Sequence, residues 1–324
     1  TIGTLPTANE AYRFLAGSNP NKRRVLIDML LERDAFAVYW AMKWCDLLRV
    51  KAEFPVNLWP NGVQAYYRWL VTSLRENKPY DEFVRELLTS SGSNFRDPQV
   101  NFYRSTQSTD PKELARAVAL TFMGVRVKNW PAEKLEEMAK FFSYVGYKST
   151  AEWKEEIVYF DAQKLRERGP HPATLPDGTT VQLTADQDPR IVFADWLIDD
   201  ENTYFARNIA NRAWFWLLGR GVIHEPDDIR DDNPPSNPVL LTALEKETVR
   251  SDYDLKELFR TILNSKTYQL SCVPQSDGPE AATLFAHYRL RPLDAEVLLD
   301  AICQITGTTE EYSSRIPEPF TWVP

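Results

Sequence analysis

The densest group of residues that could do chemistry is a polar stretch in the second half of the chain, residues 224–233, which runs HEPDDIRDDN. Carboxylates at this density could form an acid and base pair or supply oxygen ligands to Ca²⁺. The candidate catalytic residues are Asp227, Asp228 and Asp231, and the alternative metal ligands are Asp227, Asp228 and Asp232. No EF-hand spacing is present. The competing interpretation is a solvated loop whose aspartates cap helices and pair with nearby arginines.

Two loops bracketed by asparagines suggest a site that binds rather than reacts. The first loop spans residues 57–61 (NLWPN), and the second spans residues 233–237 (NPPSN). Aromatic rings with amide and guanidinium groups around them suit a carbohydrate, although rings at helical spacing are equally consistent with a buried core. The predicted binding residues are Asn57, Trp59, Asn61, Tyr67, Asn211, Arg212, Arg230, Asn233 and Asn237.

Other catalytic patterns are missing from the sequence. The three histidines, His171, His224 and His287, form no HExxH motif. There is no G-x-S-x-G motif and no glycine-rich phosphate loop, so hydrolase, kinase and dinucleotide-binding interpretations have no support. The three cysteines are far apart and form neither a zinc pattern nor a disulfide framework. Whether the protein is an enzyme stays open at this point.

Composition narrows the range of partners. The chain has 38 basic and 46 acidic residues and a formal net charge of −8, without any Lys/Arg-rich run. Nucleic acid is therefore a poor partner. No apolar run approaches the roughly 18 residues that a membrane-spanning helix needs, so we expect no transmembrane segment. A length of 324 residues suggests about two domains.

Capping residues predict a mainly α-helical chain. Thr7 and Glu10 form a capping box, and Gly17 closes the helix that they open. Prolines at first helical positions predict further helices, including residues 20–31, 111–123, 131–144 and 292–306. Short β-branched and aromatic runs predict strands at residues 157–160 and 180–183. The expected organisation is a first helical domain (1–150), a short β connector (151–187) and a second helical domain (188–324).

The two helical domains share landmarks in the same order, which predicts an internal duplication. The paired landmarks are Asp28 and Asp195, Phe36 and Phe205, Trp44 and Trp214, the two Asn-bracketed loops, Tyr80 and Tyr253, Arg85 and Arg260, and Ser90 and Ser265. If the domains are copies, they are expected to pack about a pseudo-two-fold axis with the two loops facing a shared groove. The alternative is convergence, because apolar spacing constrains every amphipathic helix.

Longer phrases of the sequence resemble a known family. Residues 2–15, 22–49 (KRRVLIDML…) and 78–95 resemble the first of a planctomycete-type tandem, domain of unknown function 1549. Residues 188–241 (DPRIVFADWL…), 254–271 and 290–307 resemble the second, domain of unknown function 1553. Such tandems usually accompany cytochrome-c-like domains in exported proteins. The resemblance therefore implies an extracytoplasmic location, in the periplasm or cell envelope, but no activity.

One departure from the family concerns haem. In many relatives the phrase matching residues 122–127 continues into a Cys-x-x-Cys-His segment, whereas here it runs directly through residues 128–131 (KNWP). Covalent haem attachment needs both thiols and the histidine, so we expect no haem c and no other cofactor. The leading hypothesis is a non-haem accessory or interaction module that binds a glycan or another envelope protein. The alternatives are a carbohydrate-active enzyme and a scaffold that docks a redox or sulfatase-like partner.

Overall fold

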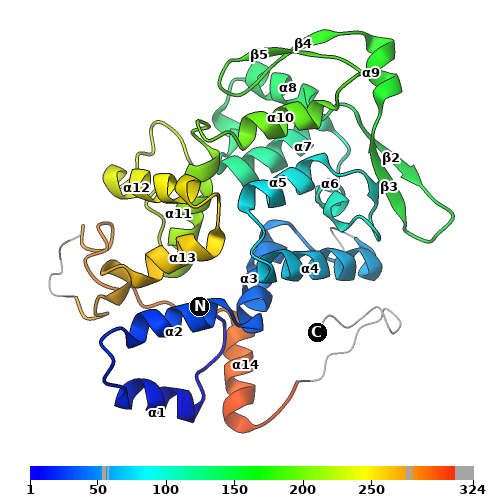
Figure 1. Cartoon of the computed structure of the whole chain (residues 1–324). Coiled ribbons are helices and arrows are strands. Elements are labelled where there is room, and N and C mark those ends of the chain that lie inside the picture. Colours follow the sequence, from blue (N-terminus) through cyan, green and yellow to red (C-terminus); the bar gives the residue numbers. More distant parts are fainter. Residues whose placement is uncertain (53–55, 57, 275–277, 279, 311–324) are drawn as a thin grey trace.

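The computed structural model describes residues 1–52, 56, 58–274, 278 and 280–310, and it is mainly α-helical with two small sheets (Figure 1). The mainly α prediction is confirmed. None of the helices in these residues is both long enough and apolar enough to cross a membrane. We use 'first domain' and 'second domain' below only as names for residues 1–150 and 188–324. The helices of the first domain are α1 (Ala8–Ala16), α2 (Lys22–Leu31), α3 (Asp34–Leu47), α4 (Trp59–Arg75), α5 (Tyr80–Thr89), α6 (Asn101–Ser105), α7 (Pro111–Val118) and α8 (Ala132–Lys140).

The predicted capping box is confirmed at the start of α1. The Glu10 amide donates to Thr7 Oγ1 at 3.2 Å, and the Thr7 amide donates to Glu10 Oε2 at 2.8 Å. Gly17 is the C-cap, as predicted. Helix α2 begins at Lys22 instead of Pro20, because the amide of Asn21 donates to the side chain of Asn19 and forms a turn before the helix. Helix α8 ends at Lys140, four residues earlier than predicted, because the chain turns there toward a strand.

Within the described residues, five short strands form two antiparallel sheets. The first has the order β1-β3-β2, with β1 (Gly92–Ser93), β2 (Val145–Ser149) and β3 (Glu156–Phe160); the second pairs β4 (His171–Thr174) with β5 (Thr180–Leu183). Helix α9 (Ala162–Arg168) lies between them in the sequence. The predicted strands at 157–160 and 180–183 are confirmed. Because β1 and β2 come from residues 1–150, the β segment is hydrogen-bonded to the first domain.

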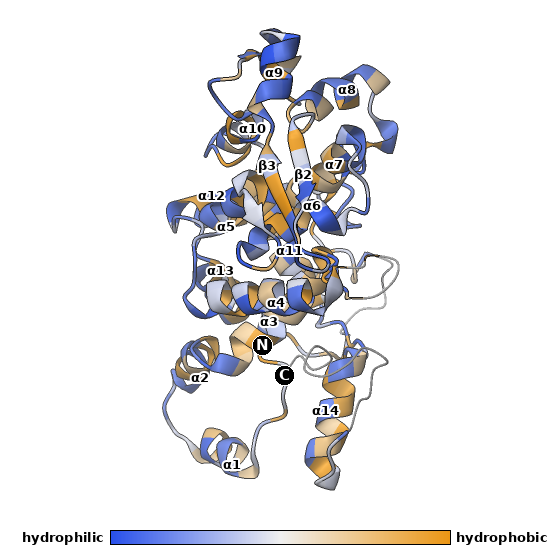
Figure 2. Cartoon of the chain, turned by 90° about the vertical axis from the view of Figure 1, so that its right-hand side faces the viewer, coloured by the Kyte–Doolittle hydropathy of each residue, from blue (hydrophilic) through white to orange (hydrophobic). Residues whose placement is uncertain are grey.

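The second domain contains five α-helices within the described residues. They are α10 (Pro189–Leu197), α11 (Phe205–Leu218), α12 (Pro238–Arg250), α13 (Leu255–Asn264) and α14 (Ala295–Thr306). Helix α14 begins three residues later than predicted. Its N-cap, Asp294, accepts a hydrogen bond from Tyr39 and pairs with Lys43 on α3. In Figure 2, α14 is apolar along much of its length, and only its Ala301 is buried.

Within the described residues, one hydrophobic core extends through both domains. Most of the aromatic side chains are buried in this core or packed against it. Trp40, Trp44 and Trp214 are each at most 2% exposed. The ring of Trp40 in the first domain stacks on Phe259 of the second at 4.4 Å between centroids. Rings at helical spacing are therefore mostly core here, which limits the aromatic residues that can face a ligand.

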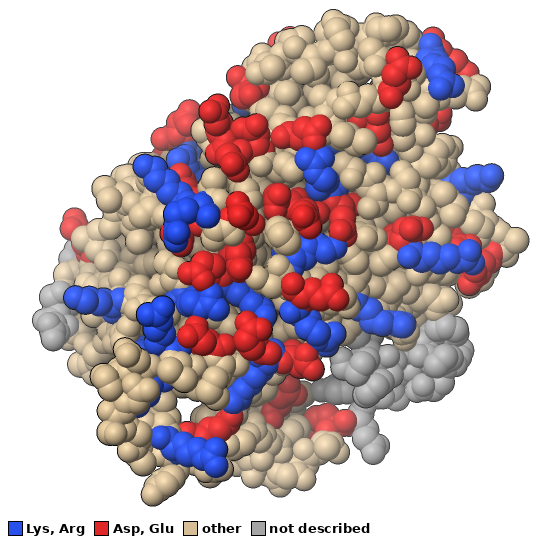
Figure 3. Space-filling view, viewed as in Figure 1, with Lys and Arg blue, Asp and Glu red and all other residues tan. Residues whose placement is uncertain are grey.

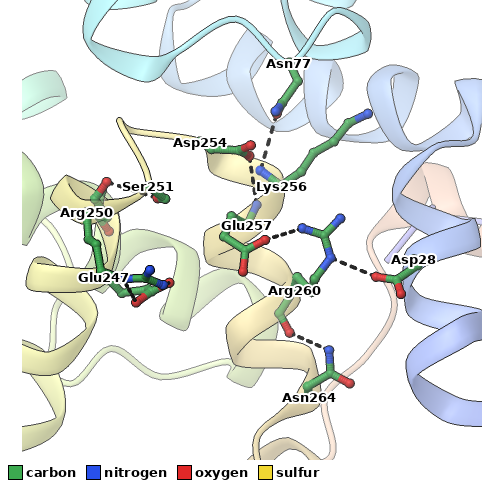
Figure 4. A network of polar contacts seen from close by, with 11 residues as sticks. Asp28, Asn77, Glu247, Arg250, Ser251, Asp254, Lys256, Glu257, Arg260 and Asn264 are labelled. Atoms are coloured by element: carbon green, nitrogen blue, oxygen red, sulfur yellow. Dashed lines mark hydrogen bonds and ion pairs between the residues drawn. The ribbon is translucent and has the colours of Figure 1, made fainter. Parts of the chain in front are cut away.

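Two corresponding pairs of helices join the two domains. Helix α5 of the first domain packs against α10 of the second, and α13 of the second packs against α2 of the first. Arg85 on α5 pairs with Asp195 on α10 at 2.6 Å. In the same way, Arg260 on α13 pairs with Asp28 on α2 at 2.8 Å (Figure 4). The face shown in Figure 3 accordingly carries basic and acidic side chains interspersed with one another.

Candidate functional site

Helix α11 presents a row of buried polar side chains toward the first domain and the polar loop. Asn208, Asn211 and Arg212 are exposed by 0%, 0% and 2%. Their spacing of three and four residues places them on one face of the helix. Buried polar groups are costly unless they are hydrogen-bonded, so the partners of these three residues define what this face does.

Two of the three residues bind a single turn of the first domain. Helix α7 continues into a π-helical turn, residues Ala119–Met123, in which the usual backbone pairing is altered. The guanidinium of Arg212 donates to the carbonyl of Thr121 at 2.6 Å and to that of Leu120 at 3.3 Å. The side-chain amide of Asn208 (Nδ2) also donates to the Thr121 carbonyl, at 3.0 Å. The π turn therefore positions the first domain against α11.

The third residue, Asn211, holds the start of the polar loop 224–233. Its side chain accepts from the amide of Ile223 at 2.9 Å and donates to the carbonyls of Ile223 at 3.0 Å and Pro226 at 3.4 Å. Farther along the loop, the Ile229 amide donates to the carbonyl of Gly124 at 2.9 Å. The loop is thus anchored to both domains.

Gly124 shows how closely the two domains approach. Its φ is +67°, and a Cβ atom there would lie 2.7 Å from Asn208 Oδ1 and 2.9 Å from Ile229 Cδ1. We expect Gly124→Ala to lower the free energy of unfolding by about 2–4 kcal/mol, because backbone strain and overpacking add. Chemical denaturation measures the change.

The matched control for this substitution is Gly307→Ala. Gly307 has a similar φ of +70°, but a Cβ there meets no atom of the described residues within 4 Å. This variant should lower the free energy of unfolding by only about 1 kcal/mol, the cost of the backbone strain alone. Equal losses in both variants would contradict the close approach at Gly124.

Between the loop and the first domain lies a hollow of about 740 Å³. This volume is within the range of small-molecule binding sites, about 300–1,000 Å³. One wall comes from the segment around the start of α8, and the other from the loop and α11. The polar and aromatic lining residues are Arg126, Asn129, Trp130, Lys134, Thr203, Tyr204, Arg207, Arg230, Asp231, Asp232 and Asn233.

Lys134 and Asp231 are oppositely charged residues that line the hollow, and Asp231 affects the pKa values of its neighbours. The Lys134 ammonium lies 4.4 Å from the centroid of the Trp130 ring. Burial lowers the pKa of Lys134, and the charge of Asp231 opposes this shift. Burial likewise raises the pKa of Tyr204, and Asp231 raises it further. The carboxylate of Asp231 therefore acts on both the ammonium of Lys134 and the phenol of Tyr204.

The aspartates named as catalytic or metal candidates are mostly engaged with arginines. Asp227 pairs with Arg212. Asp228 and Asp232 both pair with Arg230, at 3.2 and 3.3 Å. Only Asp231 and Asp232 line the hollow. In the described part of the chain, no three His, Cys, Asp or Glu residues are grouped as a metal ion would require.

The predicted binding residues of the second domain gather at the hollow. Arg230 and Asn233 line it, and Asn211 and Arg212 support it from α11. Asn237 instead caps α12 by accepting from the Leu240 amide at 3.0 Å. The sequence predicts ligand contact for all five, but four of them, Asn211, Arg212, Asn233 and Asn237, have side-chain hydrogen bonds to backbone groups of the protein itself.

The first Asn-bracketed loop lies elsewhere. Trp59 is the first residue of α4, and Asn61 and Tyr67 follow on the same helix. None of the three is among the residues that line the hollow. Asn57 lies outside the described residues. The wall opposite the second loop is thus formed by the residues around α8 and not by the first loop.

Sequence reasoning missed the residues of that wall, Arg126, Asn129, Trp130 and Lys134. A local signal was present in the run Val125–Lys128, where apolar and basic residues alternate. Val125 and Val127 are 4% and 9% exposed, whereas the two basic residues are exposed. This alternation turns Arg126 outward, but nothing local indicates that the loop of the second domain lies opposite.

Comparison with known proteins yields two family matches. Residues 1–131 match a family described as protein of unknown function (DUF1549), and residues 189–320 match one described as protein of unknown function (DUF1553). No curated protein and no solved structure matches the chain. Most of the first wall lies at the end of the first matched region, with Lys134 of α8 three residues beyond it, and the polar loop lies within the second.

Proposed function

The chain belongs to the DUF1549 and DUF1553 families, joined in tandem, and on this premise we propose that it is a carbohydrate-binding accessory module whose ligand occupies the hollow between the two matched regions. We further propose that it acts outside the cytoplasm and carries no haem c. These two parts rest on the family resemblance and on the absence of a Cys-x-x-Cys-His segment from the sequence.

The observation that carries the proposal is the lining of the hollow. Trp130, with the Lys134 ammonium over one face of its ring, and Tyr204 supply aromatic side chains, and Asn129, Asn233 and Arg126 supply hydrogen-bonding groups beside them. Sugars present apolar C–H faces and a rim of hydroxyl groups, which this combination can satisfy together. The lining is rigidly supported, because hydrogen bonds from α11 fix the loop on one side and the π turn on the other.

The carboxylates favour binding over cleavage. A glycoside hydrolase uses two carboxyl groups about 5–9.5 Å apart on either side of the scissile bond. Here arginines engage three of the four candidate aspartates, which leaves Asp231 without an ion pair among the described residues. A carbohydrate-active enzyme remains the alternative function, and hydrolysis products in the binding assay below would favour it.

Trp130→Ala tests the proposed site. The substitution removes the aromatic ring. It is expected to lower the affinity for an oligosaccharide at least tenfold, which equals about 1.4 kcal/mol. Saccharides that bind the wild-type chain are first identified on a glycan array. Isothermal titration calorimetry then compares their affinities for the two proteins.

Trp153→Ala is the matched control. Trp153 is 71% exposed, lies outside the hollow and, like Trp130, has a lysine ammonium over its ring. This variant should bind as the wild type does. Equal affinity of the Trp130→Ala variant would place the binding site elsewhere, and a failure of every saccharide to bind would refute the proposed function.

We also propose that the two domains arose by internal duplication. The reciprocal ion pairs support it, because Arg85 with Asp195 and Arg260 with Asp28 join landmarks that correspond in the two halves. Two of the four corresponding helix pairs also agree in length: α3 and α11 each have 14 residues, and α5 and α13 each have 10, whereas α2 and α10 have 10 and 9 and α4 and α12 have 17 and 13. A pseudo-two-fold axis between the copies accounts for both features.

Superposition of α2–α5 on α10–α13 in an experimentally determined structure tests the duplication. The proposal predicts a rotation near 180° that brings Asp28 onto Asp195 and Arg85 onto Arg260. Helices that follow different paths after this superposition would refute it.

A further inference from the structure

A second hollow adjoins the first. It has a volume of about 500 Å³ and is lined by residues of α7, α8 and the segment between them. Three residues, Val125, Arg126 and Trp130, line both hollows. Each hollow alone has the size of a small-molecule site. A ligand that extends past Trp130 would therefore occupy both.

The charges around the two hollows are unequal. Three acidic residues line them, Asp231, Asp232 and Glu136, against seven basic ones: Lys112, Arg116, Arg126, Lys128, Lys134, Arg207 and Arg230. Four of the basic residues have carboxylate partners, in the pairs Lys112 with Glu136, Arg116 with Glu113, Arg207 with Glu245, and Arg230 with Asp228 and Asp232.

Three basic residues remain. Among the described residues, Arg126, Lys128 and Lys134 have no ion pair, and of the three lining carboxylates only Asp231 has none. The chain as a whole has a net charge of −8, so this local excess of positive charge runs against its overall balance. An arginine or lysine without a partner at a concave site attracts anionic ligands.

The backbone presents these cations at the point where the hollows meet. Val125 and Val127 are buried, so the alternating residues Arg126 and Lys128 are both turned outward. Helix α8 begins here, with Pro131 lining the first hollow and Ala132 the second. No side chain caps its N-terminus. The positive end of the α8 dipole therefore adds to the charge of the two side chains.

We propose that the ligand is an anionic oligosaccharide that runs from the first hollow over Trp130 into the second, with its carboxylate or sulfate groups at Arg126 and Lys128. This inference rests on the proposed function and names the class of ligand that the same site binds. The rings of such a chain pack on Trp130, and its anionic groups replace the missing carboxylate partners.

The experiment is isothermal titration calorimetry of the full chain with four probes. They are tetragalacturonic acid, its full methyl ester, galacturonic acid monomer and a tetrasaccharide that carries sulfate esters but no carboxylates. The methyl ester keeps the chain and loses the charge. We expect at least one of the two anionic tetrasaccharides to bind at least tenfold more tightly than the methyl ester, about 1.4 kcal/mol, with an affinity that falls as salt is added. The monomer should bind more weakly than the tetrasaccharide.

A double variant, Arg126→Gln with Lys128→Gln, links the effect to the site. It should reduce the preference for the anionic tetrasaccharide over the ester to less than about threefold, because the charges are gone and the shape is retained. Lys154→Gln is the control, since Lys154 is a lysine outside both hollows. Thermal unfolding of each variant checks that it is folded.

The outcomes separate this inference from the proposed function. If the ester binds as tightly as both anionic tetrasaccharides, the anionic class is overturned while saccharide binding stands. If the monomer binds as tightly as the tetrasaccharide, the extension into the second hollow is overturned. If the anionic preference survives in the double variant, Arg126 and Lys128 do not provide it. If no saccharide binds, charged or neutral, both proposals fail.

Discussion

Replacing Arg190 with alanine is expected to lower the free energy of unfolding by about 3–5 kcal/mol, the cost of breaking a buried ion pair. Arg190 is 1% exposed. Its guanidinium contacts both carboxylate oxygens of Asp188, the Ser90 carbonyl at 2.9 Å and Ser91 Oγ at 2.9 Å. The substitution leaves the carboxylate of Asp188 almost buried and disconnects the start of α10 from the end of α5. Urea denaturation followed by circular dichroism measures the loss.

Arg85→Ala is the matched control at the same helix interface. Arg85 also joins α5 to α10, but its side chain is 40% exposed and that of its partner, Asp195, is 51% exposed. Exposed ion pairs contribute at most about 1 kcal/mol. A loss in the Arg190→Ala variant as small as that in Arg85→Ala would show that the buried contacts do not hold the two domains together.

Arg212→Ala is expected to lower the free energy of unfolding by about 2–4 kcal/mol. It removes two hydrogen bonds to the π turn and the ion pair with Asp227. Asp227 is 30% exposed, so water can solvate the carboxylate that remains, and the loss should be smaller than at Arg190. Because the π turn supports one wall of the hollow, saccharide binding should weaken as well.

Arg207→Ala is the stability control for Arg212. Both arginines are on α11, but the Arg207 side chain is 37% exposed and pairs with Glu245, which is 18% exposed, so water reaches this ion pair more easily than it reaches Arg212. The loss of Arg207 should cost about 1 kcal/mol, the upper end for a partly exposed pair. If the Arg212→Ala variant is as stable as Arg207→Ala, the hydrogen bonds between Arg212 and the π turn do not hold the first domain against α11.

Much of the fold could be predicted because its signals are local. The capping box of Thr7 and Glu10 lies within one turn of helix, and β-branched residues near 157–160 and 180–183 mark strands that do form. Helix starts at prolines were less accurate. Proline fits the first turn of a helix, but it also fits the turn before one, as at Pro20.

The site could be predicted only on one side. A dense polar loop is visible in the sequence, and Arg230 and Asn233 do line the hollow. The opposite wall comes from Trp130 and its neighbours, about 100 residues earlier in the chain. That pairing depends on tertiary contacts at the π turn and at Gly124, which no local pattern specifies. For the same reason, the sequence does not show that Asn211 and Arg212 bind backbone carbonyls and that Arg212 also pairs with Asp227.

If saccharides bind between Trp130 and the polar loop, a crystal structure of the chain with its tightest-binding oligosaccharide should show a sugar ring packed on Trp130. Asn233 should then lie within hydrogen-bonding distance of the hydroxyl groups of that sugar. An oligosaccharide bound instead beside Trp59 and Asn61 on α4, with the hollow empty, would contradict it.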